Sequence, residues 1–203
     1  ADTIVVFVEN VTPQFHAICQ NLVAGFPELS CIKTFLANTV EKDPHFLVSL
    51  IKQCSKNERL SVLVHGDLWA PNIIWKDETT VAGIIDWQVV HQGSPVEDFL
   101  RVLCTSTSVE NRRDLLHPLL DHYYSTLKKE LHEKDVPFSR EYLSDELKYI
   151  APYCCMMDIF ATGFWINSDV VRNGGSYESR KDELIHRCKC FVEDVIVLCG
   201  WKD

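Results

Sequence analysis

The chain has 203 residues, 46% of them hydrophobic, so it can bury a sizeable core and is not globally disordered. It carries 20 Lys and Arg against 29 Asp and Glu, a formal net charge of −9, which argues against binding to nucleic acids or anionic membranes. Its 9 cysteines are an odd number without a regular framework, which is typical of reduced thiols in a cytoplasmic or nuclear protein.

The first part of the chain is predicted to hold a strand and two helices. The β-rich stretch TIVVFVEN (3–10) favours a strand, and the apolar residues of 15–23 recur at helical spacing. A clearer helix is expected in DPHFLVSLIKQCSK (43–56), where Asp43 is a good N-cap and Pro44 a good first residue.

The middle of the chain changes to short apolar strands. SVLVH (61–65), NIIW (72–75) and VAGIID (81–86) each have the length and composition of a strand. The polar turn KDETT (76–80) joins the last two, so a β-hairpin is expected there.

Helices are predicted for the remainder of the chain. The stretch 93–103 opens with the capping-box pair Ser94 and Glu97, which is typical of a helix start. The stretch 109–131 follows, with a wide apolar stripe along one side.

The apolar run 150–166 is predicted to form part of a buried helix that begins near Ser139. The run is short for a membrane span and contains a proline and Asp158. A final helix is expected to end at Gly200, in the position of a C′ glycine. The expected architecture is a mostly helical α+β fold, a single domain over residues 1–203, with a small β-hairpin set into it.

Four polar residues stand where the predicted strands begin and end: His65, Asp67, Asn72 and Asp86. Because a hairpin returns the chain to its starting point, Asp86 is expected to lie beside Asn72. An amide oxygen and a carboxylate are hard ligands of the kind that Mg²⁺ prefers, usually together with phosphate oxygens. Asp67 is then free to accept the proton of an attacking hydroxyl, an arrangement that suits phosphoryl transfer.

Four motifs in this order, VLVHGDLWAPNIIW, AGIIDWQVV, GSPVEDFLRVL and LLDHYYSTLKKEL, together resemble the CHK kinase-like proteins. These ecdysteroid kinase-like proteins are related to choline kinases and aminoglycoside phosphotransferases. At the level of motifs the resemblance runs from about Ser61 to Leu131. It implies a protein-kinase-like fold, of which this chain would supply the helical C-terminal lobe with the catalytic loop.

By this resemblance Asp67 is the catalytic base, and Asn72 and Asp86 bind the Mg²⁺ of Mg·ATP. His65 would brace the loop, and Asp98 would support it through hydrogen bonds to its backbone. The implied reaction is transfer of the γ-phosphoryl group of ATP to a hydroxyl of a small acceptor. Sterols, amino alcohols and glycosides are the candidate acceptors, and the resemblance to ecdysteroid kinases makes a lipophilic, sterol-like alcohol the first expectation.

The nucleotide-binding lobe of such kinases is not recognisable in the sequence. Kinases hold the phosphates of ATP with a glycine-rich loop and a strand lysine paired with a helix glutamate. The residues before the HGD motif contain one glycine, Gly25, and no lysine in a strand context. The chain by itself is therefore expected to bind ATP weakly or not at all. A catalytically inactive binding or scaffold module is the alternative to an active kinase, and the oligomeric state is left open.

Overall fold

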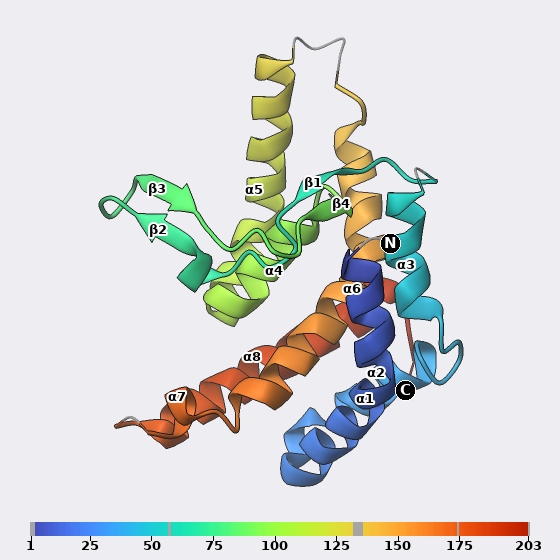
Figure 1. Cartoon of the computed structure of the whole chain (residues 1–203), viewed down its shortest axis with the longest axis vertical. Coiled ribbons are helices and arrows are strands. Elements are labelled where there is room, and N and C mark those ends of the chain that lie inside the picture. The colour runs from blue at the N-terminus through green and yellow to red at the C-terminus, as the bar shows by residue number, and fades with distance from the viewer. Residues whose placement is uncertain (1–2, 57, 132–135, 174, 203) are drawn as a thin grey trace.

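The computed structural model describes residues 3–56, 58–131, 136–173 and 175–202. These residues are mostly helical, with two separate two-stranded antiparallel sheets, as the sequence predicts for an α+β protein (Figure 1). The helices are α1 (Thr3–Gly25), α2 (Cys31–Asn38), α3 (Phe46–Ser55), α4 (Glu97–Ser106), α5 (Val109–Glu130), α6 (Arg140–Trp165), α7 (Asp169–Arg172) and α8 (Tyr177–Cys199). The strands are β1 (Val62–Val64), β2 (Ile73–Trp75), β3 (Val81–Ile84) and β4 (His91–Gly93), and short 3-10 helices span Pro27–Leu29 and Ala70–Asn72.

Helix α6 is the central element of the fold, since it packs against α1, α3, α4, α5 and α8. Its second half is apolar on nearly every side, and residues such as Ile150, Cys155, Met156 and Ile159 are buried. A helix that is apolar all round must be covered all round, which explains this central position. The buried helix predicted over 150–166 is confirmed. None of the described helices is both long enough and apolar enough to cross a lipid bilayer.

Helix α1 occupies the stretch 3–10 for which a strand was predicted, so that prediction is wrong. The side chains of Ile4, Val5 and Val8 are buried, as is Phe15 further along the same helix. They recur at helical spacing and face α3 and α6, against which α1 packs. Burial of one continuous helix face therefore outweighs the preference of Val and Ile for strands.

Two predicted helix starts are shifted in the structure. Helix α3 begins at Phe46 rather than at Asp43, whose carboxylate accepts a hydrogen bond from the N–H of His45 at 2.9 Å. Helix α4 begins at Glu97 with Val96 in the N-cap position, so Ser94 is not the N-cap that the predicted capping box requires. Both side chains of that pair are instead drawn into buried contacts with other elements.

These buried contacts tie β4 and the start of α4 to α6. The hydroxyl of Ser94 donates to Glu146 at 2.7 Å, and the carboxylate of Glu97 lies 3.2 Å from Nε2 of His91. Burial raises the pKa of the Glu97 carboxyl, although His91 favours its ionised form. Arg59 also donates to Glu146 at 2.8 Å. A fully buried carboxylate on α6 thus joins the segment before β1 to the start of α4.

One predicted helix start and one predicted helix end are confirmed. Ser139 caps the start of α6, where its hydroxyl oxygen accepts the N–H of Tyr142 at 3.2 Å. Gly200 ends α8 in the left-handed conformation with φ 68°, which glycine adopts without steric cost. Both ends depend on local hydrogen bonding, which is why the sequence reveals them.

The predicted hairpin is present as the pair β2 and β3, with Ile73 opposite Ile84. Asp77 stabilises its turn by accepting two backbone N–H groups. A second sheet, which the sequence did not predict, pairs β1 with β4 and places Val64 opposite His91. Figure 1 shows the β2–β3 hairpin projecting from the helical body, next to the loop that leaves β1.

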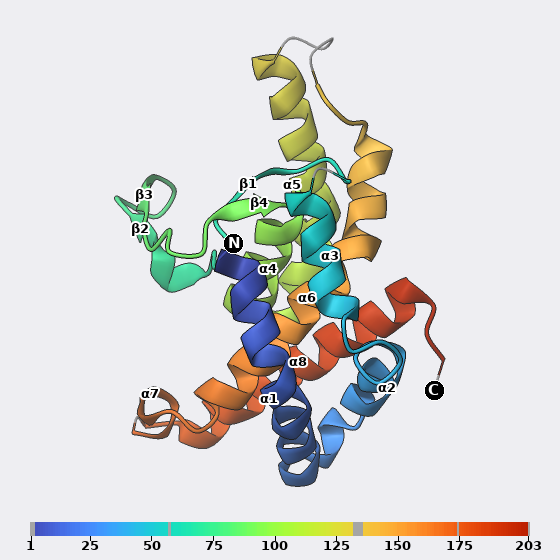
Figure 2. The same cartoon turned by 45° about the vertical axis from the view of Figure 1, so that its right-hand side comes forward.

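The apolar stripe predicted on α5 is only partly covered. Leu120 is buried, but Leu115 is 43% exposed. Both views show α5 and the first half of α6 rising side by side above the rest of the helical body (Figures 1 and 2). The outer residues of the stripe, which are half-buried and pack against the core, are Tyr123, Tyr124 and Leu127. Aromatic pairs, Phe99 with Tyr123 and Tyr123 with Phe138, hold the base of this projection together.

Candidate functional site

The loop between β1 and β2 is fixed at its start by the first turn of α4. Asp98 accepts the N–H of His65 at 2.7 Å with one carboxylate oxygen and the N–H of Gly66 at 3.0 Å with the other. These are hydrogen bonds of the kind that the resemblance implied for Asp98. Because a carboxylate forms charge-assisted bonds with both amides, the backbone here has little freedom to shift.

The buried ring of His65 joins the same loop to the end of the hairpin. Its Nε2 donates to the carbonyl of Ile85 at 2.8 Å, and its Nδ1 accepts the N–H of Asp67 at 3.3 Å. A carbonyl can only accept and an amide can only donate, so the ring is neutral with its proton on Nε2. The ring of Trp87 packs against it with 4.6 Å between centroids. His65 therefore lies where a bracing residue would lie.

The middle residue of the HGD motif has to be glycine. Gly66 has φ +81°, and a Cβ at this position would lie 2.7 Å from the carbonyl oxygen of Val89. Any larger residue would push the loop away from the segment that follows β3.

The hairpin brings the two predicted magnesium ligands to neighbouring positions. The carbonyl of Asn72 accepts the N–H of Ile85 at 3.0 Å, and Asp86 follows directly. The side-chain amide of Asn72 donates to the carbonyl of Asp67 at 2.9 Å, and Asp86 is exposed. Within the described part of the chain, no group of three or more His, Cys, Asp or Glu side chains is placed to hold a metal ion. An amide and a carboxylate at this end of the hairpin still form a donor set that Mg²⁺ can share with phosphate oxygens.

Asp67 has a partner that its own motif does not reveal. Its Oδ1 accepts a hydrogen bond from Nη2 of Arg101 on α4 at 2.8 Å. No described residue donates to its second oxygen, Oδ2. The side chain of Asp67 is 27% exposed, whereas that of Arg101 is 11% exposed. The ion pair orients the carboxylate and leaves one oxygen open to an incoming hydroxyl.

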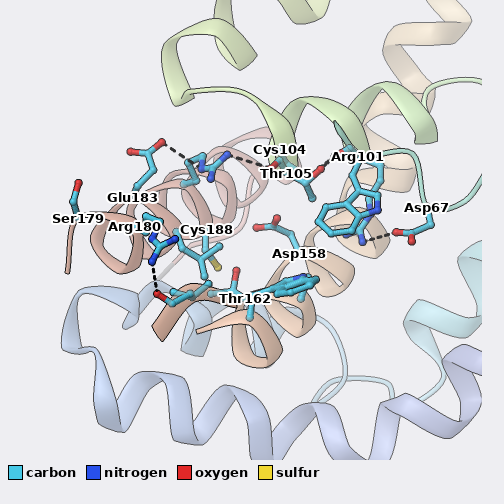
Figure 3. A pocket seen from close by; sticks show the side chains of 16 residues that line it. Asp67, Arg101, Cys104, Thr105, Asp158, Thr162, Ser179, Arg180, Glu183 and Cys188 are labelled. Atoms are coloured by element: carbon cyan, nitrogen blue, oxygen red, sulfur yellow. Dashed lines mark hydrogen bonds and ion pairs between the residues drawn. The ribbon is translucent and has the colours of Figure 1, made fainter. Parts of the chain in front are cut away.

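Asp67 and Arg101 also line a cavity of about 490 Å³ (Figure 3). Its walls come from the loop between β1 and β2 and from helices α4, α6, α7 and α8, and they are mostly apolar. Trp69 of the loop and Trp165 of α6 form part of them, with 5.5 Å between ring centroids. This volume lies within the range of about 300–1,000 Å³ that is usual for small-molecule sites.

A second carboxylate, that of Asp158 on α6, points into this cavity (Figure 3). Its side chain is buried, with 6% of the residue exposed. Burial raises the pKa of the Asp158 carboxyl to about 6, although Arg101, Cys104, Arg112 and Arg187 all act in the opposite direction. A desolvated carboxylate in a cavity is a candidate for ligand recognition.

Comparison with protein families shows to which family the chain belongs. The model of the family DUF1679, described as "Uncharacterized oxidoreductase dhs-27", matches residues 37–199, which is most of the chain. The chain belongs to the DUF1679 family.

Two proteins of Caenorhabditis elegans are similar to this DUF1679 chain. "Uncharacterized kinase-like protein D1044.1" is 29% identical over 150 residues, 69% of this chain and 39% of that protein. "Uncharacterized oxidoreductase dhs-27" is 42% identical over 74 residues, 32% of this chain and 9% of that protein. The chain thus spans less than half of either relative. No solved structure matches. A kinase-like relative agrees with the lineage that the motifs predict, while the ecdysteroid kinase-like subfamily stays a prediction.

In the DUF1679 chain the predicted site residues lie around one loop and one hairpin end: His65, Asp67, Asn72, Asp86 and Asp98. Arg101 and Asp158 were not predicted. Each had a signal in the sequence, since Arg101 follows Asp98 by about one helical turn and Asp158 is the only acidic residue of the run 150–166. The contact of Asp67 with Arg101 depends on how α4 packs beneath the loop, which no local pattern shows.

Replacing Asp158 by Asn is expected to stabilise the DUF1679 chain above pH 6. The carboxyl pKa is about 6 in the folded protein against an ordinary value of 3.8, so the native state holds this proton more tightly. The contribution of Asp158 to stability is therefore fully present below about pH 4 and is lost as the pH rises to about 6. The variant should gain roughly 2–3 kcal/mol in free energy of unfolding at pH 8 and little at pH 4.

Denaturant unfolding of both proteins at the two pH values measures this difference. Asp114→Asn, a matched change of an exposed carboxylate on α5, is the control and should have no such pH dependence. A variant that is less stable than the wild type at pH 8 would contradict the expectation.

Proposed function

We propose that this chain is the acceptor-binding and catalytic part of a small-molecule kinase, which transfers the γ-phosphoryl group of Mg·ATP to a hydroxyl. One observation carries the proposal: Asp67 lines a mostly apolar cavity, and its backbone carbonyl accepts the side chain of Asn72 at the hairpin end, where Asp86 follows Ile85. A hydroxyl in the cavity and a phosphate at the hairpin would meet at Asp67. The motif resemblance and the kinase-like relative support the same reading.

The role of Asp67 in this proposal is to accept or orient the proton of the acceptor hydroxyl. Its Oδ2 has no donor among the described residues, so it is open to that hydroxyl, while Arg101 holds Oδ1. Arg101 is a positioning residue in this scheme, because it prevents the carboxylate from turning away from the cavity. General-base assistance of this kind contributes about 10²–10⁴-fold to a reaction rate.

Asn72 and Asp86 would hold Mg²⁺, which when bound with ATP neutralises the phosphate charges and aligns the γ-phosphoryl group. The backbone of Asp86 supports this assignment, since its φ of 65° is unusual outside glycine. The conformation is maintained on its N-terminal side, where His65 donates to the carbonyl of Ile85 at 2.8 Å and Trp87 donates to that of Ile84 at 2.9 Å. Uncommon backbone angles that the surroundings enforce cluster at functional sites.

An oxidoreductase function is less well supported for this chain. The relative with that name is matched over 9% of its length. The 8 glycines of the chain do not form the G-x-G-x-x-G pattern of a dinucleotide-binding turn. The HGD loop, with its aspartate-to-asparagine spacing and returning hairpin, is a kinase feature instead.

The proposal is tested with the full-length protein, radiolabelled ATP and a panel of apolar alcohols at varied Mg²⁺ concentration. We expect a phosphorylated alcohol that requires Mg²⁺. In Asp86→Asn the Mg²⁺ concentration for half-maximal rate should rise roughly tenfold or more, because a charged ligand is lost. Asparagine also tolerates the left-handed backbone, so this variant tests the charge and not the fold. Absence of any phosphorylated alcohol, or an unchanged Mg²⁺ dependence in the variant, would overturn the proposal.

A further inference from the structure

Asp158 carries a buried carboxylate in the cavity that the proposed reaction does not use. It lies on α6, is 6% exposed, and points into the cavity in Figure 3. The thiol of Cys104 contacts its carboxylate, but Oδ2 accepts no hydrogen bond from any residue that the structure describes. Buried acceptors are nearly always paired, so this oxygen is available to a donor on a ligand.

The overall charge of the cavity favours a neutral ligand. Three arginines line it, Arg101, Arg180 and Arg187, and three carboxylates balance them, those of Asp67, Asp158 and Glu183. Arg101 pairs with Asp67 at 2.8 Å, and Arg187 lies 3.3 Å from Glu183. A cation would therefore meet the buried guanidinium of Arg101, and an anion would meet Asp158.

A hydroxyl is the neutral group that suits both sides of this wall. It can donate to Oδ2 of Asp158, and its own oxygen can accept from Arg101. Nε and Nη1 of Arg101 are buried and have no hydrogen-bond acceptor among the described residues. The rest of the wall includes Trp69, Trp165 and Ala161, so the body of the ligand should be apolar.

We propose that Asp158 anchors a second hydroxyl of the acceptor, so that the chain selects diols with an apolar body over simple alcohols, amines or anions. The inference rests on the proposed function, since it takes the cavity as the acceptor site. One hydroxyl then lies at Asp67 for reaction, and the other at Asp158 for recognition.

Binding of three small probes by the purified protein tests the inference. The probes are trans-1,4-cyclohexanediol, cyclohexanol, which lacks the second hydroxyl, and trans-4-aminocyclohexanol, which replaces it with a cation. The indole N–H signals of Trp69 and Trp165 report binding in the cavity, and the other three tryptophans, outside its lining, serve as reference signals. We expect the diol to bind roughly tenfold more tightly than cyclohexanol, and more tightly than the amine.

Two variants identify the group that recognises the hydroxyl. In Asp158→Ala the diol and cyclohexanol should bind with about equal affinity. Thr162→Val, a matched removal of another buried polar group from the same wall, should keep the preference. Equal binding of diol and cyclohexanol by the wild type, tighter binding of the amine, or an unchanged preference in Asp158→Ala would each overturn the inference. So would the absence of a saturable shift of the two signals up to about 50 mM of the diol.

The two proposals fail in different ways. Selective binding of the diol without phosphorylation by the full-length protein would leave the recognition by Asp158 standing and remove the kinase function. Phosphorylation of simple alcohols as efficiently as diols would leave the kinase function standing and remove the role of Asp158.

Discussion

Replacing Asp67 by Asn is expected to lower kcat for phosphoryl transfer by the full-length protein on the order of 10²–10⁴-fold, with little change in the KM of the acceptor. The amide cannot take the proton of the attacking hydroxyl, but it still offers an oxygen to Nη2 of Arg101, which lies 2.8 Å from the native carboxylate. The fold should persist, because the amide oxygen of the variant can still accept the hydrogen bond from Arg101 and the side chain of residue 67 is itself partly exposed. Steady-state kinetics and a thermal melt of the variant measure both parts.

A matched control for this variant is Asp77→Asn. Asp77 is an exposed carboxylate in the turn of the hairpin, where it accepts the N–H groups of Thr79 and Thr80. The same chemical change should leave kcat within about twofold of the wild type, as is usual for surface positions. A kcat for Asp67→Asn within about threefold of the wild type would show that Asp67 is not the base.

Replacing Glu146 by Ala is expected to cost about 3–5 kcal/mol in free energy of unfolding. Glu146 is fully buried and accepts from Ser94 at 2.7 Å and from Arg59 at 2.8 Å. Its removal leaves the hydroxyl of Ser94 buried without this acceptor and removes the only ion-pair partner that the described residues give Arg59. Chemical denaturation should show the loss, and the melting temperature should fall by roughly 10 °C.

The contrasting variant is Glu178→Ala, which removes an exposed ion pair with Lys181 on α8. It should change the free energy of unfolding by less than about 0.5 kcal/mol, because exposed pairs are screened by water. A double-mutant cycle of Glu146→Ala with Arg59→Ala isolates the coupling between those two residues. A loss below about 1 kcal/mol for Glu146→Ala would mean that water replaces its hydrogen bonds.

The hairpin and the polar residues around it could be predicted because their signals are local. Two apolar runs separated by KDETT specify the hairpin, and the hairpin alone brings Asp86 back to Asn72. The mostly helical body could also be predicted, since apolar periodicity and end signals at Ser139 and Gly200 are local as well.

The remaining features depend on packing between distant segments. Helix α1 looks like a strand by residue preference, and only its contacts with α3 and α6 make it a helix. The contact of Arg101 with Asp67, and the position of Asp158 in the cavity, depend on how α4 and α6 are rotated against the loop. The rotation of a helix about its own axis is set by the packing of the whole core and has no short sequence signature.

The left-handed backbone at Asp86 has a consequence at the level of the gene. A single nucleotide change in an aspartate codon can give asparagine or glycine, which accept this backbone but lack the negative charge. It can also give glutamate, which keeps the charge but disfavours the left-handed region. No single-step replacement supplies both properties, so purifying selection should hold this codon fixed wherever the metal-binding role is retained. In copies of the gene that have lost that role, Asn and Gly should be the first replacements to accumulate.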